Sequence, residues 1–116
     1  MSRIQAQQDA QVIRAALPLL ALTLIGDQES YGYEIVERLS ELGLDVSTGL
    51  IYPVLARLER DKLVTTRAVT STNGPPRKYF TLTPQGQAAK AAASQQWQLV
   101  SAAVENALTL EGHPDD

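Results

Sequence analysis

The sequence predicts a mostly α-helical fold with one small β-hairpin and a long C-terminal helix. Two segments with helical apolar spacing lie on either side of a short turn that opens on Gly43. A stretch rich in β-branched residues follows them, with a turn around Asn73-Gly74. The last helical segment is longer than a helix that only closes a small core. These three observations set the order of the elements.

Composition and charge limit the classes of protein that fit. A chain of 116 residues has the length of a single domain. The absence of cysteine excludes disulfides, thiolate metal sites and cysteine nucleophiles. The net charge is −3, but cations gather in 57–78 and anions in 27–45, a layout suited to docking. No window approaches the roughly 20 apolar residues of a membrane span, so no membrane contact and a cytoplasmic location are expected.

Residues 1–26 are expected to form the N-terminal helices. The stretch 4–16 is rich in Gln and Ala, and Pro18 suits the first turn of a second, strongly apolar segment. Either two helices meet at Pro18 or one long helix kinks there. Residues 26–30 are expected to be a turn.

Two amphipathic segments, 33–42 and 48–61, are expected to be the next helices. In each, apolar residues recur at the spacing of one helix face. Gly43 fits the position just past the end of the first. Two short helices joined by such a turn are the outline of a helix-turn-helix. The apolar residues are Ile35, Val36, Leu39 and Leu42 in one segment and Leu50, Ile51, Val54, Leu55 and Leu58 in the other.

The start of the second of these helices is suited to DNA. Ser47 is placed to cap it, because its hydroxyl can accept from free backbone N–H groups. Thr48 and Gly49 are small and let the backbone approach another surface closely. With Arg57 and Arg60 on its flank, such a helix fits a major groove. A helix that is merely half-buried against the core is the alternative.

Residues 63–82 are expected to form a hairpin that follows the helix-turn-helix as a wing. Its base carries Arg67, Arg77 and Lys78, which are placed to reach phosphates beside the groove. The alternative is a solvated hairpin edge protected by charge. Residues 1–82 are therefore expected to be a winged helix-turn-helix DNA-binding domain.

Residues 83–110 are expected to be a C-terminal dimerisation helix that starts at Thr83-Pro84. It carries two apolar strips, and one small domain cannot cover both. We therefore expect a partner helix from a second copy in a symmetric homodimer. The tail 111–116 is acidic and expected to be disordered. The expected interface strip is Ala89, Ala93, Trp97, Val100, Val104 and Leu108, and the second strip is Leu99, Ala103, Ala107 and Leu110.

Four motifs together resemble the PadR family of transcriptional regulators, of the short type with a single C-terminal helix. They are LPLLAL at 17–22, YGYEI at 31–35, STGLIYPVLARLE at 47–59, and GPPRKYFTLT at 74–83 followed by Gly86. Their order and spacing match over 17–86. The resemblance implies a homodimeric winged helix that binds a pseudo-palindromic operator, usually as a repressor.

The resemblance and the helix geometry together place the expected DNA contacts. Leu50 stands where the family usually has Thr or Ser, so a hydroxyl that could contact a base or phosphate is missing, and the family pattern does not define the operator preference or register here. Tyr52 has an alternative role, packing under the wing with its hydroxyl at the rim. Arg57 and Arg60 lie far along the helix and are expected to steer or contact the backbone. The candidate DNA-binding residues are Ser47, Thr48, Gly49, Tyr52, Arg57, Arg60, Arg67, Arg77 and Lys78.

Trp97 is the only tryptophan and lies midway along the expected dimer helix. Multidrug-sensing members of the PadR family carry a Trp at a matching place, facing its dimer mate. By this resemblance, Trp97 with Ala93 and Val100 is a candidate site for a flat aromatic effector. The alternative is that Trp97 simply fills the dimer seam.

An enzyme is not expected. The one histidine, His113, lies in the acidic tail, and no catalytic Ser/His/Asp set or phosphate-binding glycine loop is present. Neither a metal nor a cofactor is expected. A winged helix used only for protein contact is the alternative to a DNA-binding regulator.

Overall fold

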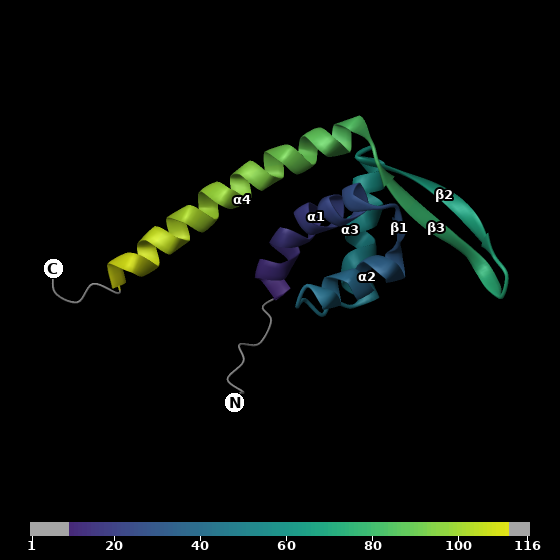
Figure 1. Ribbon diagram of the computed structural model, residues 1–116, viewed down its shortest axis with the longest axis horizontal. Coiled ribbons are helices and arrows are strands. Elements are labelled where there is room, and N and C mark those ends of the chain that lie inside the picture. The colour runs from purple at the N-terminus through teal and green to yellow at the C-terminus, as the bar shows by residue number, and fades with distance from the viewer. Residues whose placement is uncertain (1–9, 112–116) are drawn as a thin grey trace, which may run out of the picture.

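The computed structural model describes residues 10–111. Helices α1, α2 and α3 pack together, the β2–β3 hairpin extends from one side, and α4 extends from the other (Figure 1). This is the predicted architecture, with a three-stranded antiparallel sheet in place of a lone hairpin. The elements are α1 (Ala10–Asp27), β1 (Ser30–Tyr31), α2 (Gly32–Glu41), α3 (Thr48–Arg60), β2 (Val64–Ser71), β3 (Gly74–Leu82) and α4 (Pro84–Glu111).

Before residue 28 the described part of the chain forms one helix that runs through Pro18, so two helices do not meet at that residue. Helix α1 continues through Pro18, which lies on its exposed side, where solvent can satisfy the carbonyl that proline leaves without a donor. By length and mean hydropathy (1.4) α1 would also qualify to span a membrane. However, Leu17, Ala21 and Ile25 are buried against the other elements, as in the core helix of a globular domain.

The helix-turn-helix forms as predicted, with ends that follow from local chemistry. Gly43 has φ 100°, the left-handed conformation that glycine adopts without strain just after a helix. Ser47 caps α3, and its Oγ accepts from the N–H of Leu50 at 3.2 Å. Ile35 and Leu39 of α2, with Ile51, Leu55 and Leu58 of α3, are buried in the core.

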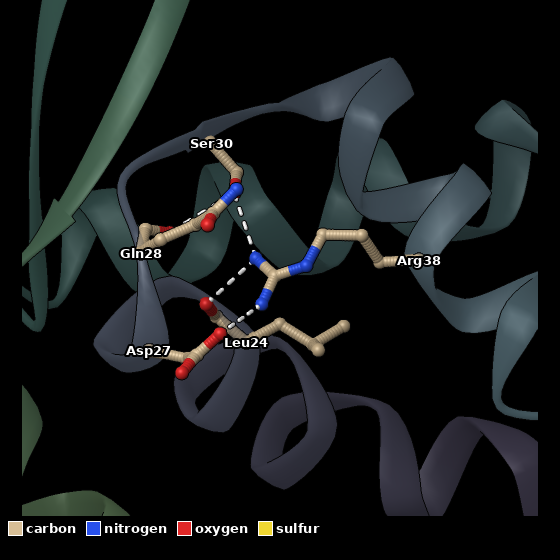
Figure 2. Close-up of polar contacts among 5 residues, drawn as sticks. All are labelled: Leu24, Asp27, Gln28, Ser30 and Arg38. Carbon is tan, nitrogen blue, oxygen red and sulfur yellow. Dashed lines mark hydrogen bonds and ion pairs between the residues drawn. The ribbon is translucent and has the colours of Figure 1, made fainter.

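Arg38 joins the end of α1 to α2 (Figure 2). Its guanidinium donates to the carbonyl of Leu24 at 2.9 Å, to Ser30 Oγ at 2.8 Å and to Asp27 Oδ2 at 2.7 Å. Ser30 is fully buried, and its hydroxyl donates in turn to the carbonyl of Gln28. Carbonyls at a helix C-terminus carry partial negative charge, so a cation is stabilised there. The network fixes where α2, and hence α3, lies relative to α1.

The sheet differs from the expected hairpin at its edge and at its tip. Strand β1 begins at the last residue of the segment expected to be a turn, and it pairs antiparallel with β3 so that the sheet order is β1-β3-β2. At the tip, Ser71 pairs with Gly74, which leaves Thr72-Asn73 as the turn instead of Asn73-Gly74. The strands thus extend into 70–77, the run of turn residues around Asn73-Gly74, with an irregular register at Val69–Ser71. Pro75 and Pro76 lie between the Val69–Arg77 and Ser71–Gly74 pairs, at this irregularity, where a strand tolerates proline.

Helix α4 starts as predicted and then leaves the domain. Thr83 Oγ1 accepts from the N–H of Gly86 at 2.9 Å and donates to the carbonyl of Lys62 at 2.8 Å. A Cβ at Gly86 would lie 2.0 Å from the carbonyl oxygen of Leu63, so only glycine allows α4 to pass this close to the wing base. The tail expected at 111–116 falls almost wholly outside the described residues.

Candidate nucleic-acid interface

The exposed side of α3 collects most of the candidate DNA-binding residues. Ile51, Leu55 and Leu58 hold the opposite side in the core. Ser47 and Thr48 lie at the N-terminus of this helix, whose free N–H groups and dipole favour anions. Ser47 Oγ uses one of its acceptor positions as a cap, so its O–H stays available to donate to a phosphate or base. The exposed residues of α3 are Gly49, Tyr52, Pro53, Ala56, Arg57 and Arg60.

Gly49 is not needed by the packing of the protein itself. An ideal Cβ built there meets Ser47 Oγ at 3.7 Å, an ordinary contact, and nothing closer. An alanine would therefore fit at this position in the free protein. The small size of Gly49 matters only if another surface approaches α3.

Tyr52 has a packed side and an exposed side. Its side chain is at the surface, with 48% of the residue accessible. Its ring also lies against Gly32 at the start of α2, where a Cβ would come within 2.3 Å of Tyr52 Cε1. The two expected roles of Tyr52, packing and surface contact, are therefore compatible.

Leu50, the departure from the family pattern, packs against the core cluster. It borders a groove of about 1,020 Å³ between α1, α3 and α4, on a different side of α3 from Tyr52. Arg57 and Arg60 border the same groove. Arg57 Nε lies 3.9 Å from Asp61 Oδ2, and both side chains are mostly exposed, so this ion pair contributes little to stability.

A groove of about 370 Å³ separates α3 from the wing. Tyr52 and Ala56 line it from α3, and Arg77 and Lys78 line it from β3. The Arg77 guanidinium carbon lies 4.5 Å from the centre of the Tyr31 ring, a cation–π distance that holds the guanidinium beside β1. The groove places basic wing residues beside the exposed face of α3.

Two of the predicted phosphate ligands already have carboxylate partners. Arg67 donates to both oxygens of Glu29, at 2.6 and 2.7 Å, and Lys78 donates to Glu59 at 2.8 Å. The hydrogen bond from Arg67 lowers the pKa of Glu29, and the bond to Glu29 raises the pKa of Arg67. The hydrogen bond from Lys78 lowers the pKa of Glu59.

Glu29 and Glu59 are not among the residues predicted to form the site. The sequence signal for them is the opposite charge of 27–45 and 57–78. Part of that charge pairs within the chain: Glu29 belongs to the acidic segment and Arg67 to the basic one.

Beyond its first turns, α4 exposes the strip expected to form a dimer interface. Ala89 packs against the core of its own chain, and Ala93 is half-buried. The rest of the strip is exposed: Trp97, Val100, Val104 and Leu108 are 48–57% accessible. Leu99 and Leu110 of the second strip are exposed as well.

Residues 21–92 match the family model described as "Transcriptional regulator PadR-like family". The chain belongs to the PadR-like family. It is 38% identical over 76 residues to transcriptional regulator Rv3488 of Mycobacterium tuberculosis, covering 66% of this chain and 70% of that protein. Members of the family regulate transcription by binding DNA and are generally not enzymes. Among the described residues no group of His, Cys, Asp and Glu is placed to hold a metal ion.

Solved structures of the PadR-like family share the fold. A PadR-like regulator from Bacillus cereus is 36% identical, with a TM-score of 0.75 over 84% of this chain and 96% of that one. A Streptococcus transcriptional regulator is 38% identical, with a TM-score of 0.74 over 84% and 97% of the two chains. The winged-helix fold with a long C-terminal helix is therefore that of PadR-like regulators.

Proposed function

We propose that this PadR-like regulator is a repressor that binds a pseudo-palindromic operator as a homodimer in the cytoplasm. The observation that carries the proposal is the capped, exposed N-terminal side of α3, where Ser47, Thr48 and Gly49 lie. Further along the same helix, Tyr52 and Ala56 border a groove whose other side is the basic wing. Such a helix end offers hydrogen-bond donors and a positive dipole to a groove lined by phosphates. In this arrangement α3 is the recognition helix.

The proposed contacts divide by position on the surface. Thr48, Gly49 and Tyr52 face the base edges of the major groove, while Ser47 donates to a phosphate at its rim. Arg77 lies at the wing side of the groove, held near Tyr31, and contacts the flanking backbone. Arg57 and Arg60 contribute mainly to the electrostatic attraction of DNA.

Helix α4 supports the homodimer. Its 28 residues span about 42 Å, and only the first turns pack on their own chain. Burying the exposed apolar strip against the same strip of a second copy removes it from water, as the self-complementary interface of a symmetric dimer requires. Two recognition helices would then meet successive major grooves about 34 Å apart on one face of the duplex.

A small aromatic effector is proposed at the same dimer seam. Trp97 is half exposed in the single chain and has the small residue Ala93 one turn before it. If the Trp97 rings of two copies face each other, a flat compound can insert between them. Titration of the dimer with planar aromatic compounds should then quench Trp97 fluorescence, and no quenching at about 50 μM would refute an affinity in the micromolar range.

Gly49→Ala tests the DNA proposal without disturbing the protein. Because the new methyl meets only Ser47 Oγ, and alanine favours a helix, unfolding stability should stay equal or rise by up to about 1 kcal/mol. If α3 lies closely in a groove, the same methyl should weaken binding to DNA from upstream of the gene, measured by fluorescence anisotropy. We expect a loss of about tenfold or more, equivalent to about 1.4 kcal/mol.

Ala15→Ser is the matched control, which also adds one heavy atom, on the exposed side of α1, and should leave binding unchanged. Equal binding by wild type and Gly49→Ala would contradict the placement of α3 in a groove. If the wild type binds this DNA no better than random sequence, the proposed operator function fails for that site. A winged helix used for protein contact would then be the better description.

A further inference from the structure

The wing is tied to the rest of the domain by a glutamate on each face. Glu59, in the last turn of α3, accepts from Thr66 Oγ1 of β2 at 3.0 Å and from Lys78 Nζ of β3 at 2.8 Å. Glu29, which precedes β1, accepts from Arg67 of β2 at 2.6 and 2.7 Å and from Thr81 Oγ1 of β3. Each carboxylate thus bonds both strands of the wing. We call this pair, Glu29 and Glu59, the carboxylate clamp.

The register of the hairpin puts the two halves of the clamp on opposite faces. Thr66 is paired with Phe80, and the next residue, Arg67, is paired with Tyr79. Successive side chains of a strand point to opposite faces. Glu59 therefore holds the face that carries the buried Phe80, and Glu29 holds the face that carries Tyr79.

We infer that Glu29 and Glu59 are positioning residues for DNA binding, which set the angle between the wing and the recognition helix. The inference rests on the proposed function. From Arg67 to the turn at Asn73 the hairpin extends about 20 Å past its clamped base. A tilt of about 10° at the base would move the tip by about 3–4 Å, more than the length of a hydrogen bond. A small change of wing angle at the clamp therefore moves the wing tip out of reach of the phosphates it would contact.

A positioning role and a purely electrostatic role of the clamp predict opposite changes in operator affinity when a carboxylate is removed. Its carboxylates are negative charges near a surface meant for phosphates, and they occupy Arg67 and Lys78. On charge alone, removing either carboxylate should strengthen binding to all DNA. If the clamp positions the wing, removal should instead weaken binding to the operator while binding to random DNA does not weaken.

The test compares Glu59→Ala, Glu29→Ala and Glu59→Gln in the full-length protein. Specificity is the ratio of affinities for the gene's own upstream duplex and a random duplex of equal length. We expect each alanine variant to lower this ratio about tenfold. Glu59→Gln should be intermediate, because glutamine can still accept from Thr66 but loses the ion pair with Lys78. Glu41→Ala, which removes an exposed carboxylate of α2, is the charge-matched control and should leave the ratio unchanged.

A measurement without DNA shows whether the wing itself moves. The chain has no cysteine, so Asn73→Cys and Glu37→Cys place spin labels only at the wing tip and on α2. In dimers labelled on one subunit, electron–electron distance measurements should give a narrow distribution of distances between the labels at positions 73 and 37. This distribution should broaden clearly in Glu29→Ala and Glu59→Ala. Circular dichroism checks that the variants are folded.

The outcomes are distinct. An unchanged distance distribution, or a specificity ratio that holds or rises in the alanine variants, would overturn the positioning role. If wild type shows no preference for its upstream DNA, the operator proposal fails there, while the distance measurement still decides whether the clamp fixes the wing. Should Glu59→Ala not fold, Lys78→Ala opens the same side of the clamp from the wing and is expected to broaden the distribution as well.

Discussion

Replacing Arg38 with alanine should destabilise the fold more than any single surface charge does. The Arg38 side chain is only 16% exposed, and its removal takes the donor from the fully buried Ser30 hydroxyl and leaves the Leu24 carbonyl only the N–H of Gln28. A buried polar group that loses its partner costs about 1–3 kcal/mol. The ion pair with Asp27, whose side chain is 71% exposed, adds at most about 1 kcal/mol. We expect a loss of about 3 kcal/mol in unfolding free energy.

The assay is urea unfolding at one fixed subunit concentration, because dimer formation makes stability depend on concentration. The slope of free energy against urea should stay constant, so the shift of the midpoint reports stability. Asp27→Ala is the control, since it removes only the exposed ion pair and should cost about 1 kcal/mol or less. If Arg38→Ala costs no more than Asp27→Ala, the buried hydrogen bonds of Figure 2 do not stabilise the fold as described.

Three further predictions follow from the packing, charge and exposure described above. Gly32→Ala should cost about 1–3 kcal/mol by forcing its methyl against the Tyr52 ring, and Tyr52→Ala should recover most of that loss in a double-mutant cycle in urea. The pKa values of Glu29 and Glu59 are lowered below 4.5 in the fold, so their contribution is complete above that pH and is lost as pH falls through the lowered values. Wing order, followed by the spin labels, should therefore not change between pH 8 and 6 (roughly) and should decrease only under more acidic conditions. Trp97→Ala should weaken self-association in sedimentation experiments, and an unchanged dimer constant would exclude Trp97 from the interface.

Features set by neighbouring residues could be predicted from the sequence. The Ser47 cap bonds a residue only three positions away, and the same is true of the Thr83 cap. Gly43 marks the end of α2 because its backbone conformation is favourable only for glycine. These local signals indicate where the helices begin and end.

Features that join distant segments could not be predicted in this way. Arg38 reaches Leu24, 14 positions earlier, and Glu29 bonds Arg67, 38 positions later. No spacing rule indicates such pairs, since the partners meet only when the sheet and helices pack. For the same reason β1 was missed: a two-residue strand is stabilised by its pairing with β3, not by its own sequence pattern.

The candidate site shows the same division. The exposed face of α3 follows from helical periodicity, so Gly49 and Tyr52 could be placed on it from the sequence. The ion pairs of the wing cations could not be predicted from the sequence, because only the folded hairpin brings Arg67 to Glu29 and Lys78 to Glu59. The basic wing is thus partly neutralised within the chain.

The central claim is that two copies of α3 bind one duplex in successive major grooves. A hydroxyl-radical footprint on DNA upstream of the gene tests it most directly. We expect protection of two short stretches on one face of the duplex, about 10 base pairs apart centre to centre, with added protection where the wings meet the flanking backbone. A single protected half-site, or uniform protection that disappears with competitor DNA, would contradict a dimeric, sequence-specific regulator.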